Sequence, residues 1–255
     1  MRTVPGSGLI LVPQGDPALE RVLARGCWSR LQRVGQPDGL QASPIDSSTF
    51  EVRDASGAAG RVQWSMTGEH NRRNALAALA AARDVGVPLA RGIEALCRFS
   101  GVRRRMEIRG VVAGVTVYDD FAHHPTAIRT TIDGLRAQVG DARILAVLEP
   151  RSNTMKLGTM AARLPDALDL ADLVFCFGEH AGKHALGWDP AEVLAPLGPR
   201  ARSHADLNAL IADIVGQARA GDHILIMSNG GFGGVHARLL KSLGQARGNS
   251  NAGEP

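Results

Sequence analysis

Short apolar runs alternate with amphipathic stretches along the second half of the chain. The runs in "RILAVLEP", "DLVFCFG" and "HILIMSNGG" are typical of strands that are covered on both faces. Helical spacing of apolar residues is found in "PTAIRTTIDGLRAQVG", "MAARLPDALDLA", "HADLNALIADIVGQARAGD" and "GVHARLLKSLG". A strand pair that turns around Gly110–Gly114 is predicted from "EIRGVVAGVTVYDD". Strands that alternate with helices predict an α/β fold with a doubly wound, mostly parallel sheet.

The first hundred residues have a different pattern. "GLILVP" predicts a short buried strand, and "PALERVLARG" predicts a helix that ends at Gly26. A hairpin with a glycine-rich turn is indicated by "STFEVRD" and "RVQWSM". Two helices are expected next, in "GEHNRRNALAALAAARDVGV", which Gly86 and Pro88 end, and in "LARGIEALCRF".

These patterns divide the chain into parts. The polar stretch "SGVRRRM" predicts a boundary near Ser100–Gly101, with one domain over residues 1–100 and another over 101–244. The last residues, 245–255, are expected to be a disordered tail because they are polar and rich in Asn and Gly.

Composition narrows the class of protein. Cys27, Cys97 and Cys176 are scattered, which favours reduced thiols in the cytoplasm over a disulfide framework. No apolar run is long enough to span a bilayer and no signal peptide is evident, so no membrane partner is expected. The net charge of +4 would suit nucleic acid, but acids and bases are interleaved and the densest basic cluster, Arg103–Arg105, has no aromatic neighbours. We therefore expect no nucleic-acid partner.

The ends of the predicted strands carry the unusual residues, which are Asp119–Asp120, Glu149–Arg151, Gly178–His180 and Ser228–Gly234. Ligands of doubly wound sheets bind at the carboxyl ends of the strands. We therefore expect these four segments to lie on one edge of the sheet.

The stretch "DDFAHHP" has three interpretations. The first is a metal site, but the side chains of adjacent histidines diverge and rarely chelate one ion. The second is structural, a polar helix start before Pro125. We favour a functional site, in which Asp120 accepts hydrogen bonds from ligand hydroxyls while His123 and His124 face an anionic substrate at the helix N-terminus.

The stretch "GEHNRRNALAALAAA" opens with His70, Asn71 and Asn74 in the first turn of a predicted helix. A capped, alanine-rich helix is the simple interpretation. The asparagines are three apart and share one face, however, and an asparagine amide can bond to both N6 and N7 of adenine.

Two further loops are rich in donors or glycine. "EPRSNTMKLG" follows an apolar strand and suits carboxylate or phosphate, although a solvated loop is the alternative. "SNGGFGGVH" indicates close approach of the backbone to a substrate, or simply a tight turn; it is not a dinucleotide fingerprint, because His236 stands where the third glycine belongs. Gly182–Lys183 only superficially resembles a P-loop, because His184 replaces the Ser or Thr.

In order, "GEHNRRNALAA", "RRRME", "YDDFAHHPTAI", "LEPRSNTMKLG" and "MSNGGFGG" resemble the Mur ligases, the ATP-dependent amide-forming enzymes of peptidoglycan synthesis, from about Arg2 to about Leu243. The resemblance implies a Rossmann-like carboxyl-terminal domain preceded by part of a central ATPase domain. It also implies magnesium and three substrates, which are ATP, UDP-N-acetylmuramate and a murein peptide. The substrates would react through an acyl phosphate.

The resemblance also assigns roles to residues. His70, Asn71 and Asn74 would hold adenine, Arg105 would reach the ribose or phosphates, and Asp120 would accept hydrogen bonds from the ribose hydroxyls. His123 and His124 would lie near the attacking amine. The peptide pocket would be lined by Arg151, Ser152, Asn153, Thr154, Lys156, Ser228, Asn229, Gly230, Gly231, Phe232 and Gly233. No metal ligands are assigned, since the family's magnesium ligands precede the matched region.

The histidine pair resembles the alanine-adding ligases, and the Asp-Asn-Pro-Arg motif of the diaminopimelate-adding ligases is absent from the sequence. The attacking amine would therefore belong to L-alanine, either at the start of a peptide or as the free amino acid. The family's P-loop also precedes the matched region, so the 255 residues alone are expected to be inactive. A nucleotide- or peptide-binding module without turnover and a dinucleotide-dependent reductase that uses Gly231–Gly234 are the alternatives.

Overall fold

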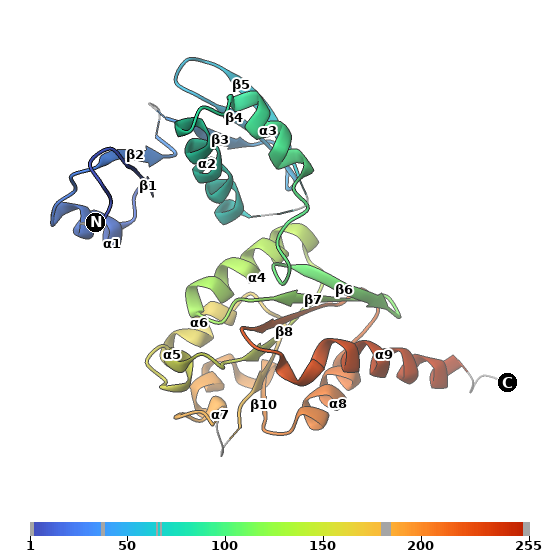
Figure 1. The fold of residues 1–255 in the computed structure, drawn as a ribbon. Helices are drawn as coiled ribbons and strands as arrows, with labels where there is room; N and C mark the ends of the chain where they lie inside the picture. Colours follow the sequence, from blue (N-terminus) through green and yellow to red (C-terminus); the bar gives the residue numbers. More distant parts are fainter. Residues whose placement is uncertain (1–2, 37–38, 65, 67, 180–184, 252–255) are drawn as a thin grey trace. The chain divides into compact units, whose positions relative to one another are not determined.

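The structure is a computed structural model that describes residues 3–36, 39–64, 66, 68–179 and 185–251, with side chains up to 246. The chain divides into two compact units, Met1–Gly101 and Val102–Pro255, and each is described by itself (Figure 1).

The first unit combines a parallel strand pair with a three-stranded antiparallel sheet. Its elements are β1 (Leu9–Pro13), α1 (Pro17–Ala24), β2 (Arg30–Val34), β3 (Gln41–Pro44), β4 (Thr49–Arg53), β5 (Ala59–Gln63), α2 (Glu69–Asp84) and α3 (Leu89–Arg98). The predicted strand, hairpin and helices are all present. In α2 the buried residues Ala75, Leu76, Leu79 and Ala80 form one stripe that packs in a core with Phe50.

The second unit contains a sheet in which, among the described residues, six strands follow the order β10-β9-β8-β11-β7-β6. All neighbours are parallel except β6 and β7, which form the predicted antiparallel pair. The elements are β6 (Glu107–Val112), β7 (Val115–Asp120), α4 (Pro125–Val139), β8 (Ile144–Glu149), α5 (Asn153–Lys156), η1 (Ala161–Arg163), α6 (Leu164–Leu168), β9 (Leu173–Phe177), α7 (Pro190–Leu194), η2 (Ala195–Arg200), β10 (Ala201–His204), α8 (Leu207–Gln217), β11 (His223–Ser228), η3 (Phe232–Gly234) and α9 (Val235–Asn251).

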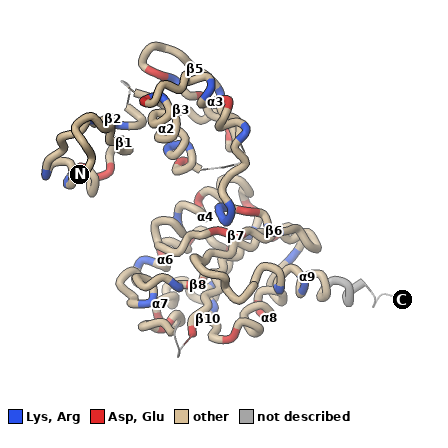
Figure 2. Tube along the Cα trace, viewed as in Figure 1, with Lys and Arg blue, Asp and Glu red and all other residues tan. Residues whose placement is uncertain are grey.

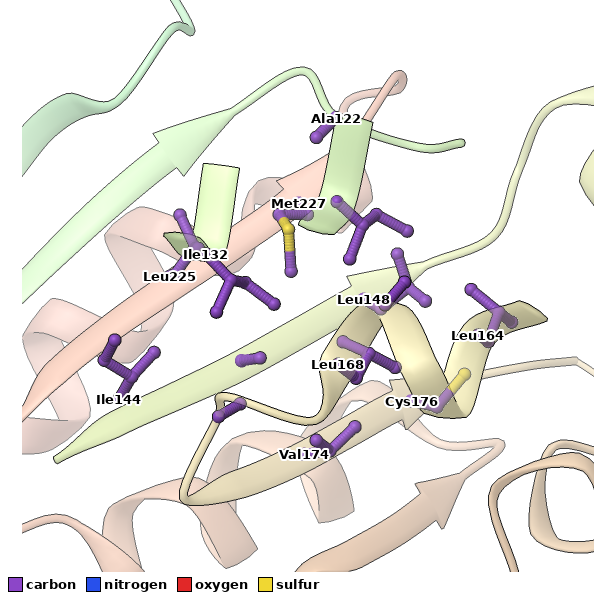
Figure 3. Packing of buried hydrophobic residues seen from close by; sticks show 14 of the residues in the cluster. Ala122, Ile132, Ile144, Leu148, Leu164, Leu168, Val174, Cys176, Leu225 and Met227 are labelled. Carbon is purple, nitrogen blue, oxygen red and sulfur yellow. The ribbon is translucent and has the colours of Figure 1, made fainter. Parts of the chain in front are cut away.

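Helices cover both faces of this sheet. Along β8, Ile144, Ala146 and Leu148 point into a core shared with α4 and α6, while Leu145 and Val147 point into a core shared with α8 and α9. Figure 3 shows the first of these cores, with Ile132 of α4 and Leu164 and Leu168 packed beside the strands. The alternation explains why these strands are apolar throughout, and it confirms the predicted doubly wound α/β fold.

Some elements differ from the prediction. The strand β10 and the helix α7 were not predicted. The strand β10 reads "ARSH", and an edge strand such as this needs no apolar run. The stretch around Leu164 is a 3₁₀ turn followed by a short helix. The helix α9 is described as far as Asn251, within the segment predicted to be a tail, and disorder of that tail stays a prediction.

Core packing in the second unit can be tested at two leucines. Leu148 is fully buried, whereas Leu157 is 74% exposed. We expect Leu148→Ala to lower the free energy of unfolding by about 2–5 kcal/mol, because it removes buried methyl groups and leaves a cavity. Leu157→Ala should change it by less than about 0.5 kcal/mol. Urea unfolding followed by circular dichroism measures both, and equal effects would contradict the described packing.

Candidate functional site

Three adjacent parallel strands end on the same edge of the large sheet. β11 lies between β7 and β8, with Met227 beside Asp120 and Ser228 beside Glu149. The prediction of a shared edge is therefore confirmed for three of the four segments, while the fourth, Gly178–His180, includes a residue outside the described part of the chain. The chain leaves β7 and β8 toward the helices of one face, but it leaves β11 toward α9 on the other face. Doubly wound sheets bind their ligands where the chain changes side between neighbouring strands in this way.

At the ends of β8 and β11, polar groups bind one another. The buried Ser228 hydroxyl donates to the Glu149 carboxylate and accepts from the Gly230 N–H at 2.9 Å. Arg151 Nη1 lies 3.9 Å from the same carboxylate. A Cβ on Gly230 would come within 2.5 Å of Arg151 Nη1, so the arginine occupies the space where a side chain would stand. The glycine therefore allows the guanidinium to lie against the backbone of the loop.

The other predicted donors after β8 form the short helix α5 rather than a loop. Ser152 is its N-cap and accepts from Met155 N at 3.3 Å. Asn153 and Thr154 are exposed in its first turn, and Lys156 is half-buried. These side chains therefore follow Arg151 on one short element at the same edge.

The glycine loop after β11 turns sharply. Gly233 and Gly234 have φ values of 55° and 68°, which suit glycine, and Gly231 is exposed. Phe232 also has a positive φ, 43°, and its ring is 1% exposed and packs 5.5 Å from that of Phe177. Phe232 was assigned to the pocket lining, but its side chain belongs to the core, so only its backbone can reach a ligand.

Asn229 begins this loop with an unusual feature. Its Oδ1 atom is buried and has no hydrogen-bond partner among the described residues. A buried acceptor without a partner costs free energy, and an N–H donor of a ligand would remove that cost. The loop therefore supplies a hydrogen-bond acceptor, Asn229 Oδ1, beside the positively charged Arg151.

Asp120 at the end of β7 is 2% exposed. Its carboxylate accepts from the backbone N–H groups of Met106 at 2.9 Å and Ala122 at 2.7 Å. Burial raises the pKa of Asp120, and these hydrogen bonds act in the opposite direction. A ribose hydroxyl that bound here would donate to carboxylate oxygens that already accept hydrogen bonds from backbone N–H groups.

The two histidines make different hydrogen bonds. His123 Nδ1 lies 2.9 Å from the Phe121 carbonyl, which accepts its N–H, so the free acceptor of the neutral ring is Nε2. His124 is the N-cap of α4 and its Nδ1 accepts from Thr126 N at 3.3 Å. The helix-cap interpretation therefore applies to His124. Among the described residues, no group of three His, Cys, Asp or Glu side chains could hold a metal ion.

The arginines before β6 also reach this edge. Arg105, which was predicted to contact the nucleotide, is exposed, with its guanidinium carbon 5.6 Å from the centre of the Phe121 ring. Arg104 was not singled out, yet its Nη2 donates to the carbonyls of Ser228 and Gly230 at 2.7 and 2.8 Å. Three adjacent arginines give no signal in the sequence that separates one role from another.

His70, Asn71 and Asn74 lie in the first unit, at the start of α2. The N-cap of this helix is Gly68, and no side chain caps it. Helix capping therefore does not account for the asparagines, and Asn74 is exposed. The segment from His180 to His184, which includes the Gly-Lys pair, lies outside the described residues.

Among the described residues, the mostly parallel six-stranded sheet matches that of a Mur ligase carboxyl-terminal domain. Residues 104–230 match the profile of the Mur ligase, glutamate ligase domain. The chain belongs to the Mur ligase family of ATP-dependent amide ligases. Family membership removes the reductase alternative.

Particular relatives are more informative than the family. The chain is 48% identical over 246 residues to the UDP-N-acetylmuramate–L-alanyl-γ-D-glutamyl-meso-2,6-diaminoheptandioate ligase of Escherichia coli K12, covering 95% of the chain and 53% of that relative. It is 35% identical to the UDP-N-acetylmuramate–L-alanine ligase of Streptomyces coelicolor, covering 95% of the chain and 54% of that relative. A murein peptide ligase structure from Psychrobacter arcticus superposes with a TM-score of 0.75 at 40% identity, over 95% of the chain and 52% of that structure.

The chain spans about half the length of these relatives. Within the part of the chain that the structure describes, no helix is both long and apolar enough to cross a bilayer. Positive and negative positions are interspersed along the trace of both units (Figure 2).

The contact between Gly230 and Arg151 can be tested directly. Gly230 does not have a positive φ, so Gly230→Ala should fold with a free energy of unfolding within about 0.5 kcal/mol of the original. The new methyl group should displace the Arg151 guanidinium, which a crystal structure of the variant would show. Gly216→Ala is the control, because a Cβ there meets nothing within 4 Å. An undisplaced Arg151 in the Gly230→Ala variant would contradict the described contact.

Proposed function

We propose that this chain acts in an ATP-dependent ligase that joins UDP-N-acetylmuramate to the tripeptide L-alanyl-γ-D-glutamyl-meso-diaminopimelate, and that its second unit binds the peptide. The relatives named for that reaction are more similar to the chain than the alanine ligases, at 48% against 35% identity. We place the reaction in the cytoplasm, because Cys27, Cys97 and Cys176 are free thiols.

The observation that carries the proposal is the arrangement around Gly230. The Arg151 guanidinium lies against it, Arg104 binds its carbonyl, and Asn229 supplies a buried acceptor. The tripeptide carries several carboxylates, and its first residue, L-alanine, supplies the attacking amine. Guanidinium groups bind carboxylates through paired, charge-assisted hydrogen bonds, so this edge suits an acidic peptide. In the same proposal Ser152, Asn153, Thr154 and Lys156 extend the pocket.

The reaction requires the alanine amine to attack the carbonyl carbon of an acyl phosphate. A carbon–nitrogen bond forms, the bond to the phosphate oxygen breaks, inorganic phosphate leaves, and the amine loses a proton. His123 suits the acceptance of that proton, because its Nδ1 is directed at the Phe121 carbonyl and its Nε2 is then unprotonated in the neutral ring. His124 uses Nδ1 to cap α4, so its neutral form carries the proton on Nε2 and is a donor.

ATP is a substrate in this family. His70, Asn71 and Asn74, at the start of α2 in the first unit, would hold its adenine. No G-x-x-x-x-G-K-[ST] pattern occurs in the 255 residues, so we assign them no part in cradling the transferred phosphate. The described residues include no group of three His, Cys, Asp or Glu side chains that could hold a metal ion, and none is assigned to magnesium.

The second candidate is a ligase that uses free L-alanine, which the Streptomyces coelicolor relative favours. Both candidates place an alanine amine at the same histidines. They differ in the rest of the ligand, because only the tripeptide has carboxylates that would reach the Arg151 side of the edge.

Calorimetric titration distinguishes these candidates. We expect the 255-residue chain to bind the tripeptide more tightly than L-alanine, and Arg151→Ala to weaken tripeptide binding at least tenfold, about 1.4 kcal/mol. Arg163→Ala, an exposed arginine on the 3₁₀ turn before α6, is the matched control and should bind as the original does. Tighter binding of L-alanine would favour the second candidate, and absence of binding by either ligand would refute the peptide pocket.

A further inference from the structure

Arg104 connects three segments that are distant in sequence. Its Nη2 donates to the carbonyls of Ser228 and Gly230, and its Nε lies 3.3 Å from Asp119 Oδ1. The guanidinium carbon also lies 5.4 Å from the centre of the Phe121 ring. One side chain thus joins the start of the second unit to the end of β7 and to the glycine loop after β11.

The charge of Arg104 is balanced inside the protein. Asp119 is 4% exposed, and it lies on the side of β7 that faces α9. His236, in the first turn of α9, places Nε2 3.4 Å from Asp119 Oδ1. Burial lowers the pKa of His236, against the opposing effect of Asp119, so the ring favours its neutral form. Asp119 is therefore the negative charge in contact with Arg104. From β6, Glu107 raises the pKa of His236 and Arg109 lowers it.

The backbone of Arg104 is fixed as firmly as its side chain. Its φ is 58°, in the left-handed region that residues other than glycine rarely adopt. Its N–H donates to the Glu107 carboxylate at 2.8 Å, and its carbonyl accepts from Phe121 N at 2.9 Å. Such a conformation persists only where the surroundings determine it, and it is common at functional sites.

The glycine loop needs such an anchor. Gly230, Gly231, Gly233 and Gly234 give its backbone more freedom than other residues would. Within the loop, Gly230 N bonds to the Ser228 hydroxyl and Gly234 N bonds to the Gly231 carbonyl. These bonds are local, whereas the two bonds from Arg104 attach the end of β11 and the loop to the turn that precedes β6.

We propose that Arg104 is a positioning residue of the peptide pocket, which holds the carbonyls of Ser228 and Gly230 and so sets the glycine loop against Arg151. The inference rests on the proposed function for the identity of the ligand, but not for the anchoring itself. Arg104 does not contact the reacting atoms in this role. A lysine could not replace it, because one ammonium group lacks the planar fork that reaches two carbonyls and a carboxylate together.

Hydrogen exchange measured by mass spectrometry tests the anchoring in the 255-residue chain without any ligand. In Arg104→Gln we expect the amides of residues 229–234 to exchange at least tenfold faster, while those of α8 keep their original rates. Arg104→Lys should not restore the original rates. Arg109→Gln is the matched control, because Arg109 is exposed on β6 and pairs with Glu107 rather than with the loop.

Asp119→Asn provides a second test, because it removes the counter-charge and leaves Arg104 in place. It should also loosen the loop, and the double variant should exchange no faster than Arg104→Gln alone, since both changes act through one contact. Loop exchange within twofold of the original in Arg104→Gln would overturn the proposal. So would equal acceleration in α8, which would indicate a general loss of stability, and so would additive effects in the double variant.

Tripeptide titration of the same variants links the anchor to the pocket. We expect Arg104→Gln to weaken binding about tenfold and Arg109→Gln to leave it unchanged. If the original chain does not bind the tripeptide, the proposed function fails while the exchange experiment still decides the anchoring. If the loop loosens but the tripeptide binds as before, the loop is not part of the pocket and the positioning role is overturned.

Discussion

The parallel pairing of β11 between β7 and β8 is the constraint on which the rest of the site depends. It places the last residues of the three strands side by side, with Ser228 next to Glu149 and Met227 next to Asp120. Because side chains alternate across a strand, Asp119 and Asp120 then face opposite layers of helices. The chain leaves β11 toward α9, on the face opposite the helices that follow β7 and β8, and doubly wound sheets bind ligands where the chain changes face in this way.

Polar groups at these strand ends are buried beside side chains that are mostly apolar. Asp119, Asp120 and Ser228 are each less than 5% exposed at the strand ends. Burying such groups costs about 1–3 kcal/mol each unless they are bonded, so each has partners. Asp120 accepts from the backbone N–H of Met106, and Asp119 pairs with Arg104. The Ser228 hydroxyl donates to Glu149. A core built for stability alone would not need these groups, which supports a binding role for this edge.

The sequence allowed the strands, the main helices and the shared edge to be predicted, because their signals are local. Apolar runs mark strands that are buried on both faces, and Pro125 marks the start of α4. Where the outcome depends on contacts between distant segments, the sequence was less informative. Arg104 and Arg105 are the same residue type, and only the fold gives one of them the carbonyls of the glycine loop. Phe232 was assigned to the pocket, but a positive φ turns its ring into the core.

The central claim is that three strand ends form one peptide site, and amide chemical-shift mapping by NMR tests it most directly. The 255-residue chain would be titrated with the tripeptide. The account predicts that amides of residues 121–124, 126, 151–156 and 228–234 shift together and saturate at the same peptide concentration. Shifts confined to one segment, or centred on the opposite edge of the sheet near His223, would contradict it.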